Sequence, residues 1–255
     1  IPRDTHLVLP ERHLGLVLPG ELEAFDGFID AAAQAMGDYV DLAQLQALAA
    51  PIAEGRMSPP PLAPLGQRIA IARDDAFAFL YPHLLDGWRQ MGAELSFFSP
   101  LADEAPAPDC DAVFLPGGYP ELHGERLAAA AAFKGGLAAT RERDALIYGE
   151  CGGFMVLGDA LVDKQGQSHA MAGLLPLTTR IDRPKRILGY RRPIQSGDLP
   201  WPGYLNGHEF HYSSAKQSRL PPLFAATDAR GEAMPPMGAV IGRVMGSYAH
   251  VVDAA

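Results

Sequence analysis

Short apolar runs alternate with longer amphipathic stretches from residue 67 onwards. Continuous apolar runs of this length predict strands buried on both faces, and the stretches between them predict helices. Strands that alternate with helices predict an α/β fold with a mostly parallel sheet and helices on both faces. The strands are predicted at 68–72, 94–98, 112–115 and 145–148, and the helices at 77–91, with a break or kink at Pro82, and at 127–143.

The first 66 residues have a different pattern. Apolar positions recur at roughly the helical period over 21–50, with a break expected at Gly37 and a second helical piece over 42–49. Such a small helical segment cannot bury a core alone, so 1–50 is predicted to be the C-terminal remnant of an upstream domain. The proline-rich stretch 51–66 predicts a stiff, extended linker, and 67–255 is predicted to be one domain.

The pattern becomes less regular after Gly158. Short strand-like runs at 189–194, 209–212 and 244–252 are separated by turns rich in proline and glycine. These runs predict additional strands with irregular connections.

Composition narrows the class of protein. The 255 residues carry 21 basic and 30 acidic side chains, a net charge of −9, which excludes a general nucleic-acid surface. No apolar run reaches the length of a membrane span, so no membrane partner is expected. Two cysteines make no disulfide framework, which favours a reducing cytoplasm. No CxxC or HExxH pattern occurs, so no metal site is predicted.

The sequence GECGG at 149–153 lies between an apolar run and the apolar FMVL at 154–157. A strand, a sharp turn and a helix with a thiol at the apex form a nucleophile elbow, with cysteine in the position of serine. The flanking glycines allow close approach, and the helix N-terminus is expected to favour the Cys151 thiolate. The alternative is a tight turn around a buried cysteine.

A cysteine nucleophile needs a base and an oxyanion site. His250 follows a late strand-like run and is one candidate base, while His208 and His211 compete with it on spacing alone. The loop PGGYPE at 116–121 exposes backbone N–H groups at the end of a predicted strand, which suits an oxyanion hole. Taken alone, His250 has the ordinary alternative of a half-buried strand histidine. The loop at 116–121, taken alone, has the ordinary alternative of a simple turn.

These motifs together resemble the cobalamin-type class I glutamine amidotransferase domain, which is flavodoxin-like. The resemblance is strongest to the cobyrinic (hydrogenobyrinic) acid a,c-diamide synthase family and covers 67–255, while PERHLGLV at 10–17 resembles the end of that family's ATP-dependent synthetase domain. The matching stretches are IAIARDDAF at 69–77, FFSP at 97–100, PGGYPEL at 116–122, GECGGFM at 149–155, LGYR at 188–191, GHEFHYS at 207–213 and SYAH at 247–250.

The resemblance implies roles for individual residues. Cys151 would attack the side-chain amide of glutamine, and His250 would take and return the proton. The amides of Gly118 and Gly152 would hold the oxyanion. Many class I relatives carry a glutamate two residues after the histidine, but Val252 stands there, so a Cys–His dyad is expected. The residues implied to shape the substrate pocket or a domain interface are Tyr119, His208, Glu209 and His211.

The resemblance also implies partners and cofactors. Glutamine would supply ammonia for amidation of the a and c carboxylates of cobyrinic or hydrogenobyrinic acid, by a ligase whose synthetase half uses ATP and Mg²⁺. No GxxxxGK[ST] phosphate loop occurs here, so neither is expected to bind this chain alone. The alternatives are the cobyric acid synthase glutaminase, a cysteine hydrolase or peptidase on the same fold, and an inactive docking module. A homodimer is left open.

Overall fold

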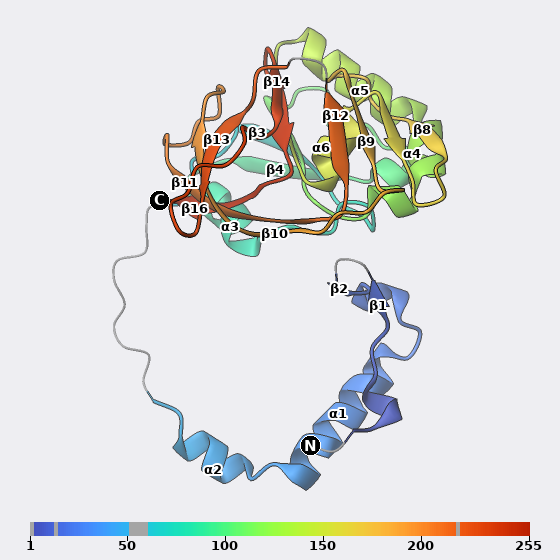
Figure 1. Ribbon diagram of the computed structural model, residues 1–255, viewed down its shortest axis with the longest axis vertical. Coiled ribbons are helices and arrows are strands. Elements are labelled where there is room, and N and C mark those ends of the chain that lie inside the picture. The colour runs from blue at the N-terminus through green and yellow to red at the C-terminus, as the bar shows by residue number, and fades with distance from the viewer. Residues whose placement is uncertain (1–2, 13–14, 51–60, 218–219) are drawn as a thin grey trace. The chain divides into compact units, whose positions relative to one another are not determined.

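The computed structural model describes residues 3–12, 15–50, 61–217 and 220–255 (Figure 1). The chain divides into two compact units, 1–58 and 59–255. No helix within the described ranges is long and apolar enough to cross a membrane.

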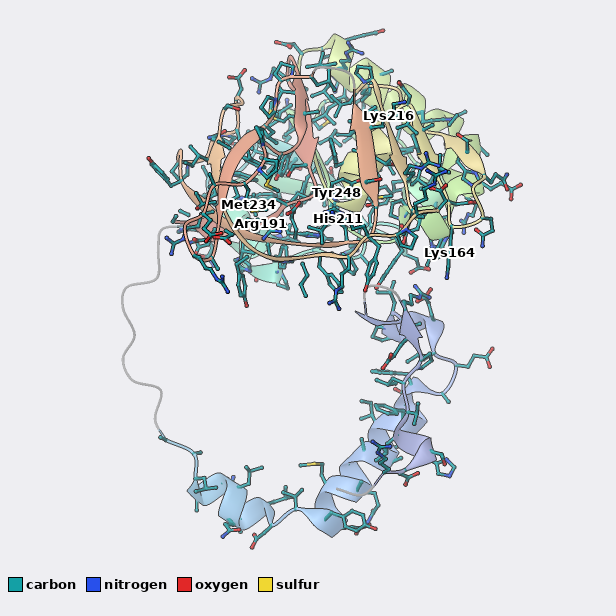
Figure 2. All side chains as sticks on the ribbon, in the orientation of Figure 1. Lys164, Arg191, His211, Lys216, Met234 and Tyr248 are labelled. Carbon is teal, nitrogen blue, oxygen red and sulfur yellow. The ribbon has the colours of Figure 1, made fainter. Side chains whose placement is uncertain are left out.

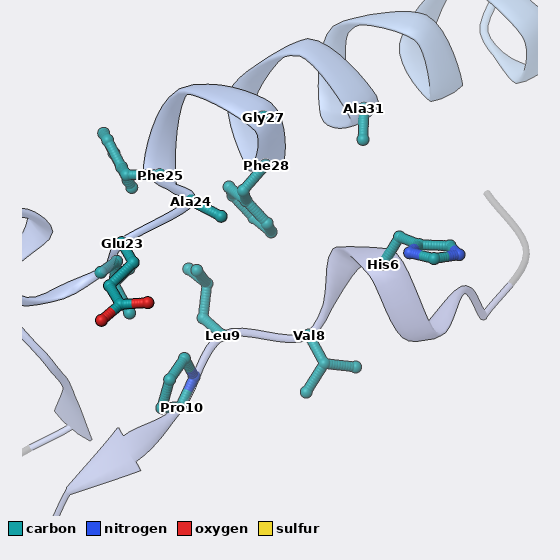
Figure 3. A pocket seen from close by; sticks show the side chains of 11 residues that line it. His6, Val8, Leu9, Pro10, Glu23, Ala24, Phe25, Gly27, Phe28 and Ala31 are labelled. Atoms are coloured by element: carbon teal, nitrogen blue, oxygen red, sulfur yellow. The ribbon is translucent and has the colours of Figure 1, made fainter.

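The smaller unit contains two helices, α1 (Phe25–Tyr39) and α2 (Leu42–Ala47). The predicted break at Gly37 is wrong, because a single glycine costs a helix only about 1 kcal/mol and α1 continues to Tyr39. Leu9 and Phe28 face each other across a cavity of about 360 Å³ (Figure 3). The remaining elements are η1 (Thr5–Leu7), β1 (Glu11–Arg12), β2 (Gly15–Leu16) and η2 (Pro19–Glu21).

The larger unit is built on a six-stranded sheet of order β14-β15-β6-β5-β3-β4. All neighbours are parallel except the edge strand β14, which runs antiparallel to β15. The predicted strands at 68–72, 94–98 and 112–115 are confirmed to the residue, and the fourth runs slightly later than predicted. The strands are β3 (Arg68–Ala72), β4 (Glu94–Phe98), β5 (Ala112–Leu115), β6 (Leu146–Glu150), β14 (Ala239–Ile241) and β15 (Val244–Ser247).

Alternate residues of the central strands enter two separate cores, one on each face of the sheet. On one face Val113 and Ile147 pack against residues of α4 (Gly124–Ala129), α5 (Ala131–Glu142) and α6 (Gly152–Leu157). On the other face Phe114 and Tyr148 pack against α3 (Pro82–Gln90) and a second sheet. Helices therefore cover both faces as predicted, but the second face is shared with strands (Figure 1).

The region after Gly158 is richer in strands than the sequence predicts. It forms a four-stranded antiparallel sheet of order β13-β10-β11-β16 and a mixed sheet of order β12-β9-β7-β8. Their strands are β7 (Ala160–Val162), β8 (Ser168–Ala170), β9 (Leu177–Arg180), β10 (Ile187–Gln195), β11 (Leu205–His211), β12 (Ser214–Gln217), β13 (Phe224–Asp228) and β16 (His250–Ala254). The short 3₁₀ turns of this unit are η3 (Pro100–Ala102) and η4 (Pro120–Leu122).

Three predicted elements have different limits. The helix predicted over 77–91 begins only at Pro82, because proline suits the first helical turn and disfavours a helix before it. The helix predicted over 127–143 is interrupted at Ala130, whose backbone leaves the helical region. The single strand predicted over 244–252 is two strands that belong to different sheets, β15 and β16.

Of the predicted linker, 51–60 lies outside the described residues. The part from Pro61 onwards has no regular secondary structure, yet Leu62 and Leu65 are buried in the same core as Trp88 of α3. The carbonyl of Ala63 accepts a hydrogen bond of 2.9 Å from Trp201 Nε1. This segment is therefore part of the packed domain.

Candidate active site

The turn between β6 and α6 places Cys151 at its apex, as the sequence predicts. Its backbone has φ 49° and ψ −107°, a conformation that costs a non-glycine residue about 1–3 kcal/mol. Its N–H donates to the Ser247 carbonyl at 2.8 Å, which ties the turn to the end of β15. A Cβ on Gly153 would overlap the carbonyl oxygen of Leu115, so the glycine permits the close approach of helix and strand.

The glycine loop after β5 lies against this turn. A Cβ built on Gly152 would stand 3.1 Å from the backbone nitrogen of Gly118, so the two predicted oxyanion residues are brought together. Gly118 itself packs so closely on the Ala76 carbonyl that a Cβ would overlap it. Tyr119, predicted to shape the pocket, is buried and packs edge-on against Phe79.

His250 is the first residue of β16 and is buried beside the glycine loop. A Cβ on Gly117 would overlap its Cε1 and lie 3.1 Å from its Nε2, so this edge of the ring faces the loop. The other ring nitrogen, Nδ1, is 3.9 Å from Glu150 Oε2. The imidazole therefore has the glycine loop beside Cε1 and Nε2 and the carboxyl of the residue before Cys151 near Nδ1.

The two competing histidines are held by other groups. His208 stacks parallel on His250 with ring centroids 4.9 Å apart, and its Nε2 is 2.7 Å from the Tyr81 hydroxyl. Both ring nitrogens of His211 have partners, with Nδ1 2.9 Å from the Ser213 carbonyl and Nε2 3.4 Å from Glu209 Oε1. This arrangement favours His250 as the base.

Burial sets the protonation states of the predicted dyad. It raises the pKa of Cys151 to about 12, although the Gly152 N–H acts in the opposite direction. Burial likewise lowers the pKa of His250 to about 3, with a smaller contribution from His208. The N–H of Gly152 at the helix N-terminus does favour the thiolate, as the sequence predicts, but desolvation outweighs this single donor and the net pKa is raised. Both groups are neutral at rest.

Glu150 is a component that the sequence analysis did not single out, although it lies within the GECGG motif. Its carboxyl is fully buried, and Oε1 accepts hydrogen bonds from the Tyr148 hydroxyl at 2.9 Å and from the Val251 N–H at 3.0 Å. Burial raises its pKa to about 8. Two features of the sequence could have pointed to Glu150. It is the residue directly before Cys151, and the chain has no glutamate two residues after His250.

A cavity of about 390 Å³ opens beside the elbow, between α6 and the late strands. Two of the four predicted pocket residues, Glu209 and His211, line it, and His208 and Tyr119 are not among its lining residues. Glu209 is held by Arg191 Nε at 2.6 Å. His211 stacks on Tyr248 at 4.0 Å between ring centroids, and both residues are labelled in Figure 2. The cavity thus has an apolar wall and a buried carboxylate, Glu209, that is fixed by a neighbouring arginine.

Within the described ranges, no group of three or more His, Cys, Asp or Glu side chains is arranged to hold a metal ion. The sequence also contains no phosphate-binding loop of the GxxxxGK[ST] type. Among the described residues, therefore, no side-chain group fits Mg²⁺–ATP.

The family model of the CobB/CobQ-like glutamine amidotransferase domain matches residues 68–254. Hydrogenobyrinate a,c-diamide synthases from Brucella abortus biovar 1 (strain 9-941) and Sinorhizobium sp are each 50% identical over 256 residues, 99% of this chain. The chain spans 59% of the length of each. A solved glutamine amidotransferase from Thermotoga maritima has a TM-score of 0.47 at 17% identity, over 72% of this chain and 75% of that chain.

Proposed function

The chain belongs to the CobB/CobQ-like glutamine amidotransferase family, and from that membership we propose that it hydrolyses glutamine at Cys151 to supply ammonia. The observation that carries the proposal is the convergence of three segments at the end of the central sheet. The strained elbow presents the thiol, the Gly118 amide lies beside Gly152, and His250 faces the same loop.

Each residue then has one role in the reaction. Cys151 Sγ attacks the side-chain carbonyl carbon of glutamine while His250 Nε2 takes the thiol proton, so that no free thiolate is needed. The N–H groups of Gly118 and Gly152 stabilise the negative charge on the carbonyl oxygen. His250 returns the proton to the departing ammonia, and water then hydrolyses the thioester to glutamate and the free thiol.

The cavity beside the elbow suits the rest of the glutamine molecule. Its lining includes Glu209, which is paired with Arg191, and the apolar surfaces of Tyr248 and Phe154. A zwitterionic amino acid with a short methylene chain needs charged partners at one end and apolar contact along the chain. Glu209 and His211 are therefore proposed as glutamine-pocket residues, and Tyr119 and His208 as supports of the catalytic groups.

The acceptor of the ammonia is inferred from the relatives. Their name, hydrogenobyrinate a,c-diamide synthase, describes amidation of two carboxylates, a and c, of hydrogenobyrinate. The chain spans about three-fifths of their length, and the ATP- and Mg²⁺-dependent activation of the carboxylates is proposed to belong to the remainder. Residues 1–50 are proposed to be the end of that synthetase part. A cytoplasmic location of the protein stays a prediction.

Glutamine hydrolysis by the chain tests the glutaminase proposal directly. We expect release of ammonia and glutamate, and covalent labelling of Cys151 by the glutamine analogue 6-diazo-5-oxonorleucine. Cys151→Ser should abolish both. Cys110→Ser is the matched control, because Cys110 is the other buried thiol and belongs to the core that contains residues of α4, α5 and α6. Labelling of neither cysteine, or cleavage of peptides without release of ammonia from glutamine, would contradict the proposal.

A further inference from the structure

Glu150 and His250 each leave one hydrogen-bonding atom without a partner in the interior. Glu150 Oε2 and His250 Nδ1 are both buried and unbonded, and they face each other at 3.9 Å. The Glu150 side chain is 1% exposed and that of His250 is 3% exposed, so both atoms lie in the interior, away from bulk solvent. An unmade bond at a buried polar atom costs about 1–3 kcal/mol.

The carboxyl group of Glu150 is oriented by its other oxygen. Oε1 is held by the Tyr148 hydroxyl and by the backbone N–H of Val251, the residue after His250. These two donors fix the carboxyl plane and direct Oε2 toward the imidazole. A movement of about 1 Å would bring Oε2 and Nδ1 to hydrogen-bonding distance, and catalytic hydrogen bonds are commonly longer before substrate binds.

We propose that Glu150 is the positioning residue of the catalytic base, accepting a hydrogen bond from His250 Nδ1–H so that Nε2 is left unprotonated toward the thiol. The proposal rests on the glutaminase function proposed above. A neutral imidazole carries one proton, so fixing it on Nδ1 leaves Nε2 as the acceptor. The carboxylate also stabilises the imidazolium that forms when His250 takes the proton of Cys151. Glu150 thereby replaces the glutamate that is absent two residues after the histidine.

The variant Glu150→Gln reverses this arrangement. The glutamine amide oxygen takes the place of Oε1, because the Val251 N–H and the Tyr148 hydroxyl require an acceptor there. The amide NH₂ then faces Nδ1 as a donor, so the imidazole proton moves to Nε2. A base in that tautomer cannot accept the thiol proton.

The pH dependence follows from the protonation of Glu150. Its pKa is raised to about 8 by burial, so the carboxyl is protonated below that pH and accepts from Nδ1–H only above it. Activity of the unmodified chain should therefore rise with pH up to about 8, by about tenfold per unit at lower pH. The remaining titratable groups that face the pair are Tyr81, Tyr148, Cys151, His208, Glu209 and His211.

The tautomer of His250 is the direct test. In long-range ¹H–¹⁵N spectra of the ¹⁵N-histidine-labelled chain at about pH 9, above the raised pKa of Glu150, we expect Nδ1–H at His250, assigned by its loss in His250→Gln. Glu150→Gln should show Nε2–H instead. The same His250 tautomer in both proteins would overturn the proposal. This measurement needs no turnover, so it separates the inference from the glutaminase proposal, which labelling of Cys151 decides.

Kinetics provide a second readout. Glu150→Gln should lower kcat for glutamine by about 10²-fold or more with KM changed less than about threefold. The residual kcat of this variant should not change with pH over the range below about pH 8, in which the activity of the unmodified chain rises. Glu150→Asp, which keeps the carboxylate, should recover part of kcat. Asp163→Asn is the matched control, because Asp163 is another buried carboxylate beside a histidine, 2.8 Å from His169 Nε2. It should lower thermal stability while leaving the pH profile unchanged. An unaltered profile in Glu150→Gln would contradict a positioning role.

Discussion

At the scale of single residues, the site combines backbone strain with desolvation. Cys151 has a positive φ at the apex of the turn, held by its own N–H bond to Ser247 and by glycines that let the neighbouring elements approach. The same close packing buries the thiol and the imidazole and keeps both neutral. Charge is therefore expected to form only during the reaction, where amides and the base already face it.

Gly118 gives the sharpest test of the oxyanion loop. In Gly118→Ala the new Cβ would overlap the Ala76 carbonyl, so the loop must shift and displace its amide. Removing one such donor lowers kcat by about 10²–10³-fold, and we expect a loss of that size in ammonia release with a smaller change in KM.

Gly135→Ala is the matched control for that loss. Gly135 lies in α5 with no atom within 4 Å of its Cβ position. The alanine should leave kcat unchanged and stabilise the helix by about 0.5–1 kcal/mol. Equal kinetics for the two variants would show that the Gly118 amide is not part of the site.

At the scale of elements, the site is formed where strands of two sheets meet. β6 supplies Glu150 and leads directly into the turn with Cys151, whereas His250 begins β16 of the antiparallel sheet. The switch between sheets occurs within three residues, from Ser247 at the end of β15 to His250. This short crossover fixes the position of the imidazole relative to the elbow.

The coil before β3 is expected to stabilise the domain as strongly as a regular element. Leu62 is 2% exposed and packs in the core that contains Trp88. Leu62→Ala should lower the free energy of unfolding by about 2–5 kcal/mol, measured by chemical denaturation. Leu48→Ala, at a side chain that is 77% exposed, should change it by less than about 0.5 kcal/mol. Similar values for the two variants would contradict a structural role for this coil.

At the scale of the whole molecule, the two units differ in what they bury. Among the described residues, both hydrophobic cores consist of residues from Leu62 onwards, and neither helix of the smaller unit contains a buried residue. Large apolar side chains remain exposed on these helices, among them Ile29, Leu42 and Leu45. This exposure supports the proposal that 1–50 ends a larger synthetase domain, which would cover the apolar faces.

Removal of residues 1–58 tests whether the larger unit is self-sufficient. Since no described residue of that segment belongs to its cores, the shortened chain should unfold within about 2 °C of the full chain, a shift below 1 kcal/mol for a domain of this size. Differential scanning calorimetry measures this directly. A decrease of more than about 5 °C would indicate packing between the two units that stabilises the larger one.

The sequence by itself determined the strands at 68–72, 94–98 and 112–115, the cysteine elbow and the glycine loop. These are local features, because a buried parallel strand needs a continuous apolar run and a strained turn needs glycines beside it. The family was also recognisable from short motifs, because each motif is a run of a few consecutive residues that carries a particular chemical group.

Only the tertiary structure decided which groups meet. The sequence left three histidines as candidate bases, and hydrogen bonds from distant segments, such as Tyr81 to His208, distinguish them. It also indicated a helix N-terminus that favours the thiolate of Cys151, but it could not show that burial by surrounding elements raises the pKa overall. Glu150 and His250 are 100 residues apart, and their contact depends on β16 lying beside the end of β6. Long-range pairing and desolvation are properties of the packed chain, which is why no local pattern carried them.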